Sequence, residues 1–561
     1  MARCTYYLWG LLLAGLVVGS GCSIRGRSVV VVPSGTAGTN VSSVGTSNAL
    51  SLEARAEAHA RFATGLSYEL SDKQDRALQE FVKAAQADPG SEDLVVDVAQ
   101  TLLQAKKYDQ AEAVLKKACA QPKPAAMVFS QLGLVHLLNG HTNAAIEVNQ
   151  AGLKRIPNSS VCYLNLFHLL AQSGRNAEAA KVVDQAASVR RPDAAFLVDL
   201  AELYRARDRV LKTTNTTSKA KAIETLDRAA SQNPTNFVVL SKMAESYARL
   251  GEAKKAADVF LKLGKQFPDF PNLRERLAEL FMRGGDTKKA AEQLEGIIRK
   301  NPTNPQAYYF LGAIAHEEKR FKDAADYYRK TLLLDPHFEQ VYYDLALSQV
   351  ASDQPKDALE VLDKAQKQFG QTFVGEFVAA LAWGHLKDYT NALRHYTAAE
   401  VVAEATDTNR LTHLFFFQYG AAFERVGRLV EAEKYLRKCL EMSPDFGEAL
   451  NYLGYMWADK GTNLTEARVM IEKALKQEPK NGAFLDSLGW VIFRQGHPAE
   501  ALTYIQQAVD LTPEPDATLF EHLGDIQQAL HESAKAREAW EKSLKLEPNP
   551  EIRKKLDRLR P

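Results

Sequence analysis

The chain has 561 residues, of which 46% are hydrophobic and 25% are charged, as in an ordinary folded protein. Its 70 basic and 69 acidic residues leave a formal charge of +1, so the composition shows no cationic excess of the kind that binds a polyanion. Five cysteines in this length do not make a disulfide framework. A chain this long ordinarily splits into several domains, unless it is a solenoid whose units pack only on their neighbours.

Residues 1–21 have the pattern of an export signal. Arg3 supplies a weak positive charge, Tyr6–Val18 an apolar stretch that is short for a membrane span, and Gly19–Gly21 a small-residue cleavage site. The pair Gly21-Cys22 resembles the end of a bacterial lipoprotein signal, and this resemblance implies that Cys22 is lipidated and becomes the mature N-terminus. Gly19 stands where that family prefers leucine. Ordinary secretion and an uncleaved anchor are therefore the alternatives.

Residues 22–50 are predicted to be a flexible linker. The segment is rich in Gly, Ser, Thr and Val and shows no helical periodicity. Ser23, and not aspartate, follows the cysteine. By the lipoprotein resemblance this favours the outer membrane over the inner one, with the folded part of the chain facing the periplasm.

From residue 51 onward a single spacing organises the chain. Fourteen alanines recur, and nine of the thirteen steps between them are 34 residues long. A proline stands twelve residues after the alanine in ten of the fourteen units, where it ends a helix. The alanines are Ala77, Ala111, Ala145, Ala179, Ala222, Ala256, Ala290, Ala324, Ala358, Ala392, Ala432, Ala467, Ala501 and Ala536.

This grid resembles the tetratricopeptide repeat (TPR), a helix–turn–helix unit. The resemblance implies an all-α fold, a right-handed α-solenoid of about fourteen repeats. We expect repeats one to ten in residues 51–400, repeats eleven to fourteen in residues 401–550, and a capping helix in residues 551–561.

The alanines have a packing role, because helices approach closely only where small residues cross. Large residues four positions later are predicted to fill the space beside each crossing, for example Phe81, Tyr328 and Trp540. The grid is interrupted near Thr213–Thr217 and between Glu400 and Arg410. These insertions are either bends of the superhelix or tolerated surface loops.

The sequence contains no phosphate-binding glycine loop, nucleophile elbow or Cys/His set with metal spacing. We therefore predict no catalytic, cofactor-binding or metal-binding residues, and a protein that is not an enzyme. Function is then expected to be recognition.

The first helix of each repeat carries a second face, about 120° from its packing face. In TPR proteins the corresponding face lines the inner groove. Here it is aromatic, which suits an extended peptide or a glycan, although the same rings would also suit packing against the next repeat. The predicted groove contacts are Tyr309, Tyr343, Phe377, Phe417, Tyr455, Trp490 and Phe493, with Glu275, Glu279, Glu521 and Asp525 as acidic flanks.

Three runs in the last third, Ala449–Tyr455, Leu485–Trp490 and His522–Asp525, resemble the closing repeats of bacterial TPR lipoproteins. That group includes an outer-membrane adaptor of a carboxyl-terminal processing protease. The resemblance implies a scaffold that binds other proteins, such as a protease or cell-wall enzyme, at the bacterial envelope and does not bind nucleic acid. The alternative is a component of polysaccharide export or secretion that binds a glycan or a secretion partner.

Overall fold

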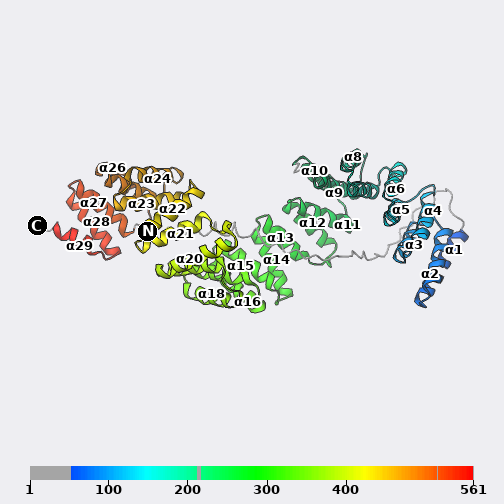
Figure 1. Ribbon diagram of the computed structural model, residues 1–561, viewed down its shortest axis with the longest axis horizontal. Coiled ribbons are helices and arrows are strands. Elements are labelled where there is room, and N and C mark those ends of the chain that lie inside the picture. Colours follow the sequence, from blue (N-terminus) through cyan, green and yellow to red (C-terminus); the bar gives the residue numbers. More distant parts are fainter. Residues whose placement is uncertain (1–51, 212–215, 515, 560–561) are drawn as a thin grey trace. The chain divides into compact units, whose positions relative to one another are not determined.

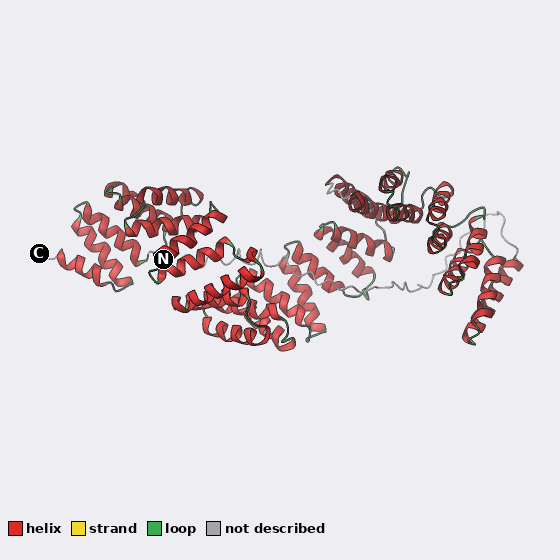
Figure 2. Ribbon diagram, viewed as in Figure 1, coloured by secondary structure: helices red, strands yellow, loops and turns green. Residues whose placement is uncertain are grey.

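The computed structural model describes residues 52–211, 216–514 and 516–559, and within them the chain forms 29 α-helices, one 3-10 helix and no strand (Figures 1 and 2). By internal contacts the chain divides into two compact units, Ser28–Gly296 and Met1–Arg27 with Ile297–Pro561. We call their described parts the N-terminal unit and the C-terminal unit. The division falls within α14 (Thr287–Lys300).

The N-terminal unit is a series of helix pairs joined by short turns. Its helices before α14 are α1 (Leu52–Leu70), α2 (Gln74–Ala87), α3 (Glu92–Gln104), α4 (Tyr108–Cys119), α5 (Ala126–Leu138), α6 (Thr142–Arg155), α7 (Ser160–Gln172), α8 (Asn176–Ala187), α9 (Ala194–Leu211), α10 (Thr216–Ser231), α11 (Phe237–Arg249), α12 (Ala253–Gln266) and α13 (Leu273–Arg283).

The C-terminal unit continues the same alternation. Its helices are α15 (Pro305–Glu317), α16 (Phe321–Leu334), α17 (Glu339–Ala351), α18 (Pro355–Phe369), α19 (Phe373–His385), α20 (Tyr389–Thr406), α21 (His413–Arg425), α22 (Leu429–Met442), α23 (Gly447–Lys460), α24 (Leu464–Gln477), α25 (Gly482–Arg494), α26 (Pro498–Leu511), α27 (Ala517–Ala529), α28 (Ser533–Leu546) and α29 (Pro550–Arg558).

In the pairs from α1/α2 to α11/α12 and from α15/α16 to α27/α28, the odd-numbered helix comes first and packs on the even-numbered helix that follows it. First helices also contact one another, as α7 does α9 in the N-terminal unit and α23 does α25 in the C-terminal unit. Within each unit, one layer therefore consists of first helices and the other of second helices.

The predicted alanine register is confirmed. All fourteen alanines are at most 2% exposed, and each lies on a second helix. Opposite them, glycine lets the first helix approach: a Cβ at Gly312 would lie 2.6 Å from the ring of Tyr328, and one at Gly489 would lie 2.6 Å from Ile505. These distances are too short for any side chain, so the crossings require the small residues found there.

The second predicted insertion is absorbed by helix and not by an irregular loop. Helix α20 extends to Thr406, and a 3-10 helix, Thr408–Arg410, follows it directly. The first insertion, near Thr213–Thr217, falls between α9 and α10, and residues 212–215 lie outside the described part of the chain.

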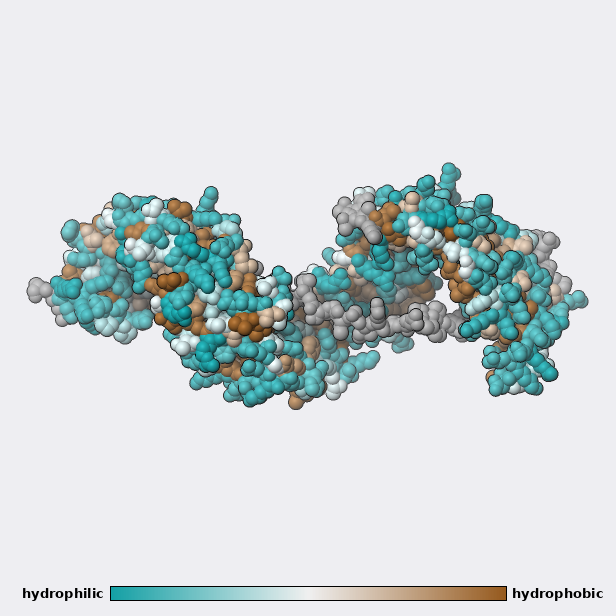
Figure 3. All heavy atoms as spheres, in the orientation of Figure 1, coloured by the Kyte–Doolittle hydropathy of each residue, from teal (hydrophilic) through white to brown (hydrophobic). Residues whose placement is uncertain are grey.

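The predicted signal peptide (residues 1–21), the lipidated Cys22 and the linker (residues 22–50) lie outside the described residues. Within residues 52–211, 216–514 and 516–559, no helix has both the length and the apolarity that a membrane span needs. The face shown in Figure 3 is mainly hydrophilic, and its apolar side chains are scattered in small groups.

A helix, α29, stands where the capping helix is predicted. Its Ile552 and Leu556 are buried and pack with Ala536 and Trp540 of α28. On another side of the same helix, the ammonium of Lys555 lies 2.7 Å from both carboxylate oxygens of Asp525 in α27. The last helix therefore covers α28 and is also tied to the preceding first helix.

Candidate functional site

We call the side of the first helices that carries the predicted groove residues the inner face. On α23, α25 and α27 it forms one connected group of side chains, which we call the Trp490 cluster: Tyr455, Asp486, Trp490, Phe493, Arg494 and His522. Three successive repeats contribute to it. It is therefore a property of the stacked repeats and not of any one of them.

The indole of Trp490 is stacked on the imidazole of His522, with ring centroids 4.0 Å apart and planes 16° from parallel. Tyr455 approaches the same imidazole at 6.0 Å, and Phe493 lies 5.3 Å from the indole. The Arg494 guanidinium lies 5.7 Å from the indole centroid, within cation–π range. Rings from three helices therefore form one connected aromatic group, in which Tyr455 and Phe493 are partly exposed.

Helix geometry places these groups on one side. Asp486, Trp490 and Arg494 are four residues apart on α25, so they share a face one turn above another. Helix α25 begins at a fixed position, because the Asn481 side chain accepts hydrogen bonds from the N–H groups of Ala483 and Phe484. The cap sets the register of the helix and thus the direction of Trp490.

His522 is 3% exposed and is held by Asp486, whose carboxylate lies 2.8 Å from Nδ1. Burial lowers the pKa of His522, but the carboxylates of Asp486, Asp525 and Glu521 outweigh burial and hold the pKa above its ordinary value. The pKa of the Tyr455 hydroxyl is also raised, first by burial and then by carboxylates including Asp486 and Asp459. The local potential at the cluster is therefore negative.

One polar group of the cluster has no partner among the described residues. Trp490 is 8% exposed, and its indole N–H is buried without an acceptor. A buried donor left unpaired costs about 1–3 kcal/mol. The cluster is thus incompletely satisfied in the isolated chain.

Two predicted contact residues lie earlier in the C-terminal unit, on α15 and α17. Tyr309 is partly buried, with its ring 4.8 Å from that of Phe338. Tyr343 is 4% exposed; its hydroxyl donates to Glu339 and accepts from Thr372, both at 2.9 Å. The structure does not bring them together with Trp490, and their role in binding stays a prediction.

Phe377 and Phe417 are each 7% exposed. Phe377 lies 5.7 Å from Phe415, and Phe417 lies 5.4 Å from Phe446, distances typical of packed aromatic pairs. Both rings therefore join adjacent repeats, and their role as ligand contacts also stays a prediction.

A cleft of about 230 Å³ opens beside Tyr343, between α18, α19 and α20. Trp383 and the buried carboxylate of Glu376 line it. His395 lies 2.6 Å from one carboxylate oxygen of Glu376, and Gln371 donates to the other at 3.0 Å. Both oxygens are therefore engaged within the chain.

Among the described residues no group of three or more His, Cys, Asp or Glu side chains is placed to hold a metal ion.

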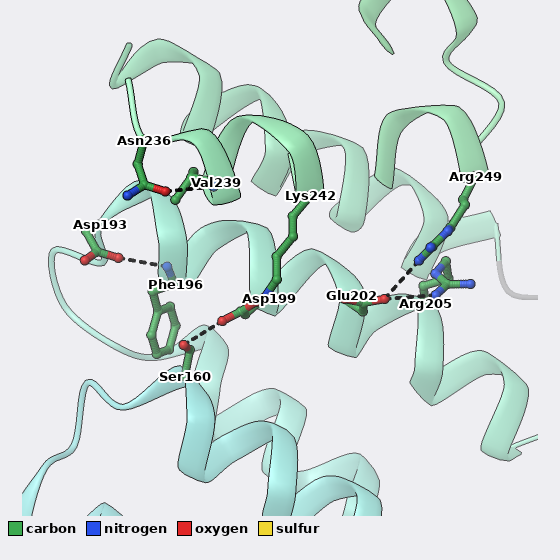
Figure 4. A network of polar contacts seen from close by, with 10 residues as sticks. All are labelled: Ser160, Asp193, Phe196, Asp199, Glu202, Arg205, Asn236, Val239, Lys242 and Arg249. Carbon is green, nitrogen blue, oxygen red and sulfur yellow. Dashed lines mark hydrogen bonds and ion pairs between the residues drawn. The ribbon is translucent and has the colours of Figure 1, made fainter. Parts of the chain in front are cut away.

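In the N-terminal unit, charged side chains join the first helices α9, α11 and α13 (Figure 4). The carboxylate of Asp199 on α9 accepts from Ser160 at 2.7 Å and from Lys242 on α11 at 3.1 Å. Glu202 accepts from Arg205 at 3.2 Å and from Arg249 at 3.3 Å. Opposite charges on neighbouring first helices are thus paired with each other.

The pairing continues to α13, where Arg276 donates to Glu245 of α11 at 3.0 Å. Glu245 also pairs with Arg249 of its own helix at 3.5 Å. We call Asp199, Glu202, Lys242, Glu245, Arg249 and Arg276 the charge ladder. Its carboxylates are occupied by cations of the same unit.

The sequence analysis missed His522, Asp486 and Arg494 as members of a site. Asp486 and His522 are 36 residues apart, close to one repeat length, so their contact across adjacent repeats was available from the register. The structure shows that the last three of the seven predicted aromatics, Tyr455, Trp490 and Phe493, lie in one connected group with His522.

Models of the tetratricopeptide repeat family match residues 72–123, 239–269, 275–337, 315–381, 415–446 and 458–514. The TPR repeat-containing protein PA4667 of Pseudomonas aeruginosa is 44% identical over 102 residues, 18% of this chain and 17% of that protein. The type IV pilus assembly protein PilF of the same bacterium is 28% identical over 138 residues, 24% of this chain and 53% of that protein.

The chain thus spans about a sixth of the first of these relatives and about half of the second. Among solved structures, the Cut9–Hcn1 hetero-tetramer has a TM-score of 0.40 at 16% identity, covering 83% of this chain and 96% of that one. Yeast Tom70 has a TM-score of 0.32 at 16% identity, covering 89% of this chain and 99% of that one. The helix pairs, the buried alanine register and the family matches agree: the chain is a tetratricopeptide repeat protein, with the fold of a protein-interaction scaffold.

Proposed function

We propose that this protein is a non-catalytic scaffold that binds partner proteins at a bacterial envelope through the inner face of its C-terminal repeats. The observation that supports the binding site is the Trp490 cluster. It combines a connected aromatic group, partly exposed at Tyr455 and Phe493, with a buried indole N–H that has no acceptor among the described residues. Tryptophan, tyrosine and arginine are enriched among the side chains that dominate protein–protein binding.

The envelope location rests on the sequence of residues 1–22. The apolar stretch, the small residues and Cys22 suit a lipidated precursor, and Ser23 suits sorting to the outer membrane. Replacing Cys22 with alanine tests the anchor. Loss of the variant from the membrane fraction is the expected result, and its retention there would show that lipidation is not what holds the protein.

The partners of a scaffold in this place are envelope enzymes or assembly factors, and a protease or cell-wall hydrolase is our first candidate. The second candidate is a component of polysaccharide export or secretion, because an aromatic surface also stacks on sugar rings. One relative is itself named as a pilus assembly protein. The two candidate functions predict that different envelope proteins bind to this chain.

Affinity capture from detergent-solubilised envelopes separates them. Recovery of proteases or hydrolases supports the first candidate, and recovery of a porin or synthase supports the second. The paired variant Tyr455→Ala with Trp490→Ala is expected to retain helicity and lose the captured partner. Tyr396→Ala is the matched control, because it removes a ring that is 3% exposed from a second helix of the same unit. Equal loss of capture by the control would assign the effect to destabilisation.

A further inference from the structure

The inner face around the Trp490 cluster carries more anionic than cationic groups. Its carboxylates are Asp459, Asp486, Glu521 and Asp525, and its permanent cations are Arg494 and Lys555. His522 adds a third positive charge when it is protonated. Four carboxylates against two permanent cations leave the face negative.

These charges are not cancelled pair by pair as they are in the charge ladder. Lys555 alone serves two carboxylates, at 3.1 Å from Glu521 and 2.7 Å from Asp525. Arg494 donates at 2.6 Å to the backbone carbonyl of Asp459, not to its side chain. The Asp459 side chain is exposed, one helical turn beyond Tyr455 on the same side of α23. A negative potential therefore reaches the surface beside the exposed part of Tyr455.

From this geometry we infer that the Trp490 cluster binds an extended polypeptide segment that carries lysine or arginine side chains. This inference rests on the proposed scaffold function, whose partner class it names. The aliphatic stem of a lysine or arginine lies along the rings of Tyr455 and Phe493, and its charged end lies near Asp459 and Glu521. An acidic segment is repelled by the same carboxylates.

The indole of Trp490 gives the binding a second component. Its N–H is covered by protein atoms, so a carbonyl of the bound backbone reaches it only if the ring turns. Such a turn changes the stacking on His522, which lies 4.0 Å away. Binding therefore changes the fluorescence of Trp490, and this change is absent in Trp490→Phe.

The test uses the full chain and three fluorescein-labelled peptides of about ten residues. The first contains glycine, leucine and lysine; in the other two, glutamine or glutamate replaces every lysine. Fluorescence anisotropy is expected to show the lysine peptide binding at least about tenfold more tightly than the glutamine peptide. The glutamate peptide should not saturate, and the advantage of lysine should shrink as salt is added.

Variants that remove carboxylates test whether the preference for lysine comes from Asp459 and Glu521. Asp459→Asn with Glu521→Gln should weaken the lysine peptide about five- to tenfold and leave the glutamine peptide unchanged. The matched control is Asp357→Asn with Glu360→Gln, which removes two exposed carboxylates from the second helix α18 of the same unit. That variant should bind both peptides as the unaltered chain does.

Four results would overturn the inference: equal binding of lysine and glutamine peptides, no binding of the lysine peptide at about millimolar concentration, equal weakening by the α18 control, or displacement of the lysine peptide by a neutral oligosaccharide. Capture from envelopes by the Tyr455/Trp490 variant tests the scaffold function separately. Loss of capture together with equal binding of lysine and glutamine peptides would leave that function standing and reject only the cationic partner.

Discussion

The two units place the same helix pairs on the same register but join their first helices in different ways. In the charge ladder, Asp199 and Glu245 accept from cations on neighbouring helices, and each carboxylate is occupied. In the Trp490 cluster, stacked rings join the helices and an indole N–H is left without an acceptor in the described residues. A partner that displaced a ladder contact would have to replace it, whereas at the cluster it can satisfy a group that has none. Shared architecture therefore does not imply shared binding.

The largest expected effect comes from removing the ring at the centre of the cluster. Trp490→Ala should lower the free energy of unfolding of the C-terminal unit by about 3–5 kcal/mol, because a buried indole leaves a cavity and His522 loses its stack. Denaturant unfolding followed by circular dichroism measures this. A change below about 1 kcal/mol would contradict the prediction and would mean that the ring contributes little to packing.

A substitution in the shared scaffold should affect both units alike. Ala256→Leu in the N-terminal unit and Ala324→Leu in the C-terminal unit each overpack a crossing, since both alanines are 0% exposed. Each should cost about 1–3 kcal/mol of unfolding free energy. Urea unfolding of the two variants checks this, and an unchanged midpoint in either one would contradict the register at that crossing.

The cluster should respond to pH through His522. Its folded-state pKa lies above the unfolded value, so its contribution to stability is complete below about pH 6.5 and is lost as pH rises through the folded-state pKa. Unfolding free energy of the chain should fall across this interval. In Asp486→Asn, which removes the nearest carboxylate, the fall should be smaller. Resonances of the His522 ring in NMR spectra provide the direct titration, and a midpoint below about 6.5 would contradict the prediction.

The smallest effect is expected at the charge ladder. Arg249→Met removes the contacts to Glu202 and Glu245, but the Arg249 side chain is 51% exposed, and such pairs contribute about 0.2–1 kcal/mol. The loss should diminish with added salt, and peptide binding at the Trp490 cluster should not change. A loss above about 2 kcal/mol would contradict the prediction that these exposed pairs contribute little to stability.

The sequence alone was sufficient to predict the repeats, but it was not sufficient to predict which residues form the Trp490 cluster. The spacing of alanines predicted crossings such as that of Ala324, and the same grid predicted that Tyr328 fills the space beside that crossing, where its ring lies against Gly312. Periodicity also placed Trp490 on the inner face. It could not separate rings that face a ligand from rings such as Phe377 that pack on Phe415, because both occupy equivalent positions.

Side-chain contacts between repeats that are separated by an insertion could not be predicted from the sequence for a different reason. Asp199 and Lys242 are 43 residues apart because an insertion lies between them, and no fixed repeat length predicts their pairing. Asp486 and His522, with no insertion between them, were predictable in principle. Side-chain partners on successive repeats can thus be inferred where the repeat length is constant and not where it changes.

Helix α29 affects the charge of the inner face as well as the packing of α28. Lys555 is the cation nearest to Glu521 and Asp525, so removal of residues 550–559 would subtract a positive charge from a surface that is already negative. The same cut would expose the Trp540 ring that Ile552 and Leu556 cover. Proteolytic removal of α29 would therefore strengthen the attraction of the inner face for cationic segments. It would also destabilise the packing of the final helix pair, α27 and α28.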